Sequence, residues 1–64
     1  MSAADFDSRV LASLRAGLSS ARAIEEAEGV NAAAVRNSLE RLESRNLVVH
    51  LGASWKALPA RGEA

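Results

Sequence analysis

The chain has 64 residues, with eight Lys or Arg, eight Asp or Glu, and no Cys. This length allows a single domain over residues 1–64, and the lack of Cys excludes disulfides and thiolate metal sites. A formal net charge of zero argues against a protein that binds polyanions over its whole surface. With one Trp, one Phe and no Tyr, the core must be built from Leu, Val, Ile and Ala, and an Ala-rich composition favours helices.

The charges are divided unevenly along the chain. Residues 1–28 hold three Arg against five acids, whereas residues 29–64 hold five bases against three acids. The first seven residues carry two acids where a secretory signal carries positive charge, and no apolar run is long enough to span a membrane. We therefore expect a cytoplasmic protein without a membrane partner, whose second half is the basic one.

The first helix is predicted over residues 8–16. Asp7 is a favoured N-cap residue at its start. Gly17 supplies a helix terminator at its end. The apolar residues that fall on one face of this helix are Val10, Leu11 and Leu14.

A second, shorter helix is predicted over residues 21–28, with Ser19 or Ser20 as its cap. Gly29 ends this helix, and two residues later the next helix begins. A turn of this length that contains glycine is typical of a helix-turn-helix connection. The side chains expected on the buried side of the second helix are Ala23, Ile24 and Ala27.

The third helix is predicted over residues 31–45, with Asn31 as its N-cap and Asn46 as its stop. At 100° per residue, one narrow stripe must face the core, and it consists of Val35, Leu39 and Leu42. Small and polar side chains on the opposite face suit either close approach to another surface or plain exposure to solvent. This face holds Ala33, Asn37, Glu40, Arg41 and Ser44, with Arg36 at its edge.

After Asn46 the apolar pattern changes to a period of two. Residues 47–51 and 54–58 are rich in strand formers and are divided by Gly52-Ala53, which predicts a β-hairpin. A domain this small needs its one large aromatic residue for burial, so Trp55 is expected to pin the hairpin onto the first and third helices. The segment after the hairpin, residues 59–64, begins with a proline and is expected to be frayed.

The sequence holds no constellation of catalytic residues. His50 is the one histidine, and no second His, Cys or Asp stands at ligand spacing from it. Nucleophile and base pairs, paired carboxylates in a cleft and phosphate-binding glycine loops are also absent from the pattern. We therefore expect a protein that is not an enzyme and that uses no metal, cofactor or small-molecule substrate.

The order helix, short helix, tight turn, helix and hairpin resembles the winged helix-turn-helix family of DNA-binding domains. The resemblance covers residues 7–58, and the motifs that carry it are Val10-Leu11-x-x-Leu14, Leu18-Ser19, Ala23-Ile24-x-x-Ala27-x-Gly29-Val30-Asn31, Val35-Arg36-x-x-Leu39-x-x-Leu42, Asn46-Leu47-Val48 and Trp55-x-x-Leu58. Two residues depart from the family pattern. Glu28 stands where an apolar residue is usual, and Glu40 places an acid on the face of the third helix.

The resemblance implies a mainly α fold with a small hairpin, the three-helix winged helix-turn-helix. It implies that helix 31–45 enters the major groove of double-stranded DNA and that hairpin 47–58 is the wing. On DNA, Asn37 suits a bidentate contact to adenine, and Arg36 suits guanine or phosphate. The residues expected to contact DNA are Ser20, Asn31, Ala33, Arg36, Asn37, Arg41 and Lys56.

The function expected on this basis is a small transcriptional regulator or DNA-replication accessory factor. The alternative is a winged-helix module that binds protein and not DNA, which the zero net charge and Glu40 favour. Arg36 and Glu40, four residues apart, can also form an ordinary surface ion pair. Whether the chain acts as a monomer, as a homodimer or with a protein partner is left open by the sequence.

Overall fold

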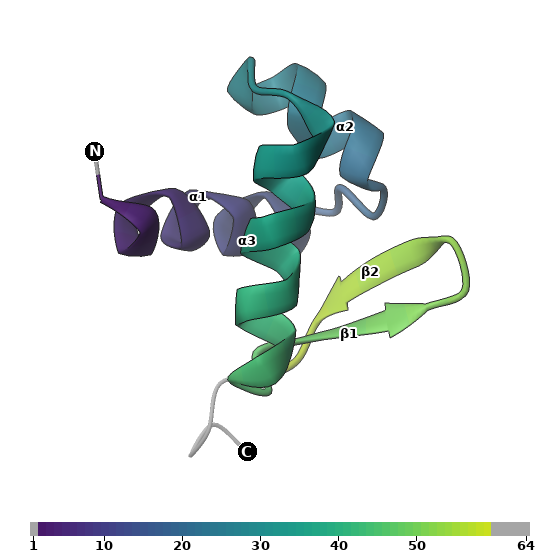
Figure 1. Cartoon of the computed structure of the whole chain (residues 1–64). Helices are drawn as coiled ribbons and strands as arrows, with labels where there is room; N and C mark the ends of the chain where they lie inside the picture. The colour runs from purple at the N-terminus through teal and green to yellow at the C-terminus, as the bar shows by residue number, and fades with distance from the viewer. Residues whose placement is uncertain (1, 60–64) are drawn as a thin grey trace.

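Three helices followed by a two-stranded hairpin make up the chain in a computed structural model, which describes residues 2–59. The elements, in chain order, are α1 Ala3–Arg15, α2 Ala21–Glu28, α3 Ala32–Ser44, β1 Val48–Leu51 and β2 Ser54–Ala57. Figure 1 shows α3 crossing over α1, with the hairpin extending to one side. The predicted fold class, mainly α with a small hairpin in the winged helix-turn-helix layout, is confirmed.

Helix α1 begins five residues earlier than the sequence predicted. Its N-cap is Ser2, whose hydroxyl accepts a hydrogen bond from the backbone N–H of Asp5 at 3.2 Å. The predicted cap, Asp7, is wrong, because this residue lies within the helix and its carboxylate is buried against α3. The chain leaves the helix at Gly17, whose φ of +110° is one that residues with a side chain rarely adopt.

Helix α2 has the predicted bounds, and Ser20 is its cap, with the hydroxyl accepting from Ala23 N–H at 3.1 Å. Gly29 closes the helix in the left-handed conformation, with φ +67°. Of the predicted buried side, Ile24 is fully buried but Ala27 is exposed. The prediction for Ala27 was wrong because the covered side of α2 runs through Ala21, Ile24 and Glu28.

Helix α3 is capped by Asn31, whose side-chain oxygen accepts from Ala34 N–H at 2.8 Å. At its other end Asn46 adopts φ +62°, the left-handed conformation that this residue type tolerates. The predicted core stripe is confirmed, since Val35, Leu39 and Leu42 are all buried.

The hairpin pairs its strands in antiparallel register, with His50 opposite Trp55, and turns at Gly52, whose φ is +62°. Trp55 is buried, as predicted. Its backbone N–H donates to the carbonyl of Ser19 at 2.7 Å, which ties β2 to the connection between α1 and α2. The first strand begins one residue later than predicted, at 48, and the second ends one residue earlier, at 57.

One apolar core joins all five elements. Its buried members are Val10, Leu14, Ile24, Val35, Leu39, Leu42, Val48 and Trp55. None of the helices among residues 2–59 combines the length and the apolar character that crossing a bilayer requires. The frayed tail was predicted for residues 59–64. Pro59 lies outside the strands, and residues 60–64 lie outside the described part of the chain.

Candidate nucleic-acid interface

The first turn of α3 presents hydrogen-bond donors to solvent. Asn31 uses its side-chain oxygen for the cap, so both N–H groups of its amide remain available. Ala32 and Ala33, next along the chain, are exposed and carry only a methyl group. Another surface can therefore approach the backbone closely at this end of the helix.

Arg36 and Asn37 continue the exposed face of α3 by one turn. Both side chains are exposed, and within residues 2–59 neither takes part in a hydrogen bond or ion pair. Because positions three and four apart lie on one side of a helix, these residues share a face with Ala33. The alternative ion pair between Arg36 and Glu40 does not form. The guanidinium of Arg36 is therefore available to a ligand.

Arg41 is already engaged within the protein, which the sequence did not predict. Its Nε donates to Oδ2 of Asp7 at 3.0 Å, and its Nη2 donates to Oδ1 of the same carboxylate at 2.8 Å. The side chain of Arg41 is still 44% exposed. Arg41 therefore lies on the exposed face of α3 as predicted, but its guanidinium is paired with the carboxylate of Asp7 on α1.

The carboxylate of Asp7 is held in its ionised form by these contacts. The hydrogen bonds from Arg41 lower the pKa of Asp7 below its ordinary value of 3.8. Burial opposes this shift, whereas the hydrogen bond from the Ser38 hydroxyl and the positive charges of Arg41 and Arg45 add to it. The hydrogen bonds to Asp7 in turn raise the pKa of Arg41 above its ordinary value. Asp7 and Arg41 therefore remain a charged pair near neutral pH.

Ser38 is a polar residue inside the core stripe of α3. It is fully buried, and its hydroxyl donates to Oδ1 of Asp7 at 2.5 Å. This contact was not predicted from the sequence, although Ser38 stands three residues after Val35 and four before Leu42, on the buried side of the helix. A serine at such a position needs a buried partner, and Asp7 is that partner.

The other two predicted DNA contacts, Ser20 and Lys56, come from outside α3. The Ser20 hydroxyl accepts a bond at the start of α2 and keeps its own O–H for another acceptor. Lys56 follows the buried Trp55 on β2 and so points to the outer face of the hairpin. It lines a groove with Arg15 of α1, and no residue of α3 lines that groove. Lys56 is therefore not brought together with Arg36.

Two of the three acidic residues of α2 form ion pairs with arginines. Glu28 forms an ion pair with Arg9 at 2.6 Å and is mostly covered, which explains an acid where an apolar residue is usual. Glu26 pairs with Arg22 at 3.7 Å on the surface. On α3, residues 31–37 include no acid, and Glu40 and Glu43 lie in the second half of the helix. The exposed end that carries Arg36 is thus the one free of negative charge.

The last two observations concern metal binding and similarity to known proteins. Within residues 2–59, no group of three or more His, Cys, Asp or Glu is placed to hold a metal ion. In comparisons with known proteins, no family model, curated protein or solved structure matches the chain.

Proposed function

We propose that the protein binds double-stranded DNA as a winged helix-turn-helix domain, in the cytoplasm, as a transcriptional regulator or replication accessory factor. The observation that carries the proposal is the exposed face of the first half of α3, within residues 31–37, which holds unpaired donors and no acid. A face of this kind fits the major groove, where Asn37 can pair with adenine and Arg36 with guanine.

The backbone at the start of α3 supports the same proposal. Alanines at positions 32 and 33 let the helix terminus approach a phosphate, and its free N–H groups favour an anion there. Ser20, at the start of α2, keeps a hydroxyl donor. Contacts of this type position a protein on the duplex, whereas contacts from Arg36 and Asn37 carry sequence information.

The decisive experiment is a titration of the protein against mixed-sequence duplex DNA over a series of salt concentrations. About three to five phosphate contacts give a slope of roughly −2.7 to −4.5 in a plot of log affinity against log salt. Arg36→Ala is expected to weaken binding and, where it contacts phosphate, to reduce the slope by about 1. Asn37→Ala is expected to weaken binding with little change in the slope.

Arg15→Ala is the matched control, because Arg15 is also exposed and lies at the end of α1. It removes the same charge without touching α3. Equal weakening by Arg15→Ala and Arg36→Ala would mean that overall charge, not the α3 face, drives binding. No binding at low salt would refute the proposal.

The second candidate is a winged-helix module whose α3 face binds a protein. Glu40 and Glu43 on the exposed second half of α3 favour it, because neither forms an ion pair within residues 2–59 and both oppose contact with phosphate. Failure of duplex DNA to bind at low salt, together with a folded wild-type protein, would favour this candidate.

A further inference from the structure

The outer face of the hairpin carries apolar side chains on β1, which a solvated wing does not require. Val48 and Trp55 point into the core, so the alternation of strand side chains turns Val49 and Leu51 outward. Leu51 is 55% exposed and is the one large hydrophobic residue that is exposed among residues 2–59. This side of β1 therefore leaves apolar surface in water.

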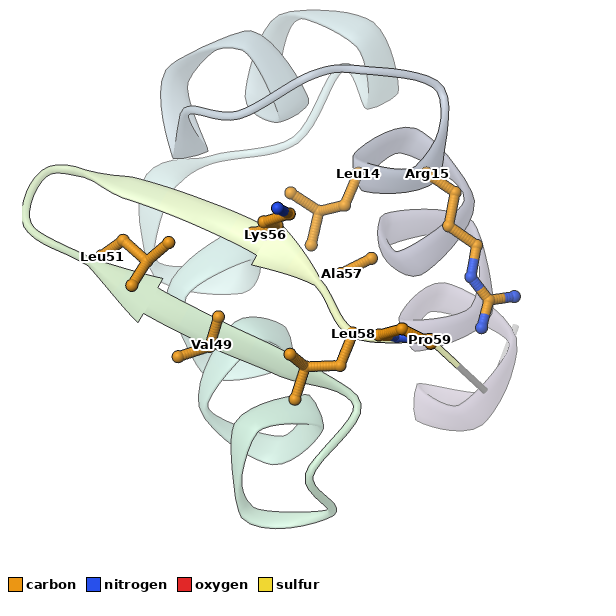
Figure 2. A pocket seen from close by; sticks show the side chains of 8 residues that line it. All are labelled: Leu14, Arg15, Val49, Leu51, Lys56, Ala57, Leu58 and Pro59. Carbon is orange, nitrogen blue, oxygen red and sulfur yellow. The ribbon is translucent and has the colours of Figure 1, made fainter. Parts of the chain in front are cut away.

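The outward side chains line an open groove of about 730 Å³, which Figure 2 shows from close by. Its apolar lining includes Leu14 from α1, Val49 and Leu51 from β1, and Leu58 after β2. A volume of this size lies within the range of sites that take a small ligand or a few side chains. The groove lies on the hairpin and α1, apart from the exposed face of α3.

The charges at this groove all have one sign. Arg15 and Lys56 are its charged lining residues, and no acid lines it. Both side chains are exposed and neither forms an ion pair in the described part of the chain. An occupant that complements the groove must therefore combine apolar side chains with carboxylates.

Other occupants fit less well. A second copy of the chain docking by two-fold symmetry would bring Arg15 and Lys56 close to the same residues of its partner, and like charges there oppose association. A nucleic acid backbone would match the two cations but would leave the side chains of Val49, Leu51 and Leu58 against charged phosphates. Residues 60–64, which follow Pro59, contain no large apolar side chain that could fill the groove.

We propose that this groove docks a short acidic and apolar peptide segment of another protein. Leucine-type side chains of the segment pack on Leu51 and Val49, and its carboxylates pair with Arg15 and Lys56. This site is independent of the DNA-binding face, so one domain holds DNA with α3 and a protein partner with the outer face of the hairpin.

The test is an NMR titration of the ¹⁵N-labelled protein with a capped eight-residue peptide that contains three leucines and three aspartates. The amide signals of residues 14–15, 49–51 and 56–58 are expected to shift. Leu51→Ser should weaken binding about tenfold, since it removes most of the apolar contact. Lys56→Glu should abolish binding of the aspartate peptide and favour a peptide with lysine in place of aspartate. Arg36→Ala is the matched control and should bind like wild type.

Three results of this titration would overturn the proposal. They are the absence of any shift at millimolar peptide, shifts confined to α3, and equal binding of a control peptide that has asparagine in place of aspartate. Sedimentation of the protein alone is the second measurement. A dimer that Leu51→Ser abolishes would show a self-association surface instead, and shifts of the same amides on adding duplex DNA would show a nucleic acid surface. Both would refute the peptide site, and neither depends on whether α3 binds DNA.

Discussion

The carboxylate of Asp7 in α1 accepts two hydrogen bonds from the guanidinium of Arg41 in α3, at 2.8 and 3.0 Å. The Ser38 hydroxyl donates a third at 2.5 Å. Asp7 stands more than thirty positions from Ser38 and Arg41 in the sequence, and the three side chains meet between α1 and α3. The cluster fixes α1 on α3 through a partly buried polar contact, and it also determines how much of the Arg41 charge faces solvent.

Asp7→Ala is expected to destabilise the protein by about 1–3 kcal/mol, because it leaves the buried Ser38 hydroxyl without an acceptor. For a domain of this size the melting temperature falls by roughly 4–8 °C for each kcal/mol. Urea unfolding followed by circular dichroism measures the loss. Asp5→Ala is the control, since Asp5 is exposed in the first turn of α1. An equal loss in both variants would mean that the cluster adds nothing specific.

The protein is expected to lose stability in acid because the carboxylate of Asp7 becomes protonated. The pKa of Asp7 in the folded protein lies below its ordinary value of 3.8, mainly through the hydrogen bonds from Arg41. Its stabilising effect is therefore complete above about pH 4 and is lost as the pH falls through the lower folded pKa. Asp7→Asn should flatten this acid limb, as measured by unfolding free energies at a series of pH values. Glu43→Gln is the control, because it removes an exposed carboxylate of α3 that forms no ion pair within residues 2–59. An acid limb in Asp7→Asn like that of the wild-type protein would contradict the assignment.

The sequence predicted most of the fold because the local signals agree with the tertiary structure. Capping residues and glycines placed α2 and α3 to within a residue, and the change of period after Asn46 marked the hairpin. The start of α1 failed for a physical reason. Asp7 has the residue type of an N-cap, but its carboxylate accepts hydrogen bonds from Ser38 and Arg41 on α3. The helix is capped by Ser2 instead.

The candidate DNA-binding face was predicted less completely than the fold. Helical periodicity places Ala33, Arg36 and Asn37 together without any knowledge of α1. It cannot show that Arg41 has a partner, because that partner comes from another helix. Nor does the alternation in β2 show that Lys56 and Arg15 line the same groove, since this depends on how the hairpin packs on α1.

His50→Ala is expected to loosen the hairpin. The imidazole stacks on the indole of Trp55, with ring centroids 4.1 Å apart and planes 2° from parallel. Aromatic pairs of this geometry contribute about 0.5–1.5 kcal/mol beyond burial, so the free energy of unfolding should fall by about that amount. Near-ultraviolet circular dichroism of Trp55 reports the change directly. Val49→Ala, on the other face of the same strand, should leave that spectrum intact, and an unchanged spectrum in His50→Ala would exclude the stack.

Asp7→Asn is expected to strengthen binding to duplex DNA, if α3 binds DNA as proposed. Neutralising the carboxylate frees the charge of Arg41, which lies a turn beyond Asn37 on the same helix and is already partly exposed. One more phosphate contact steepens the salt slope by about 0.9. The control is Glu26→Gln, which removes one negative charge from the surface pair with Arg22 on α2. Because net charge changes equally in the two variants, a larger gain in Asp7→Asn isolates the release of Arg41. Equal gains would mean that only net charge matters and that Arg41 remains turned toward α1.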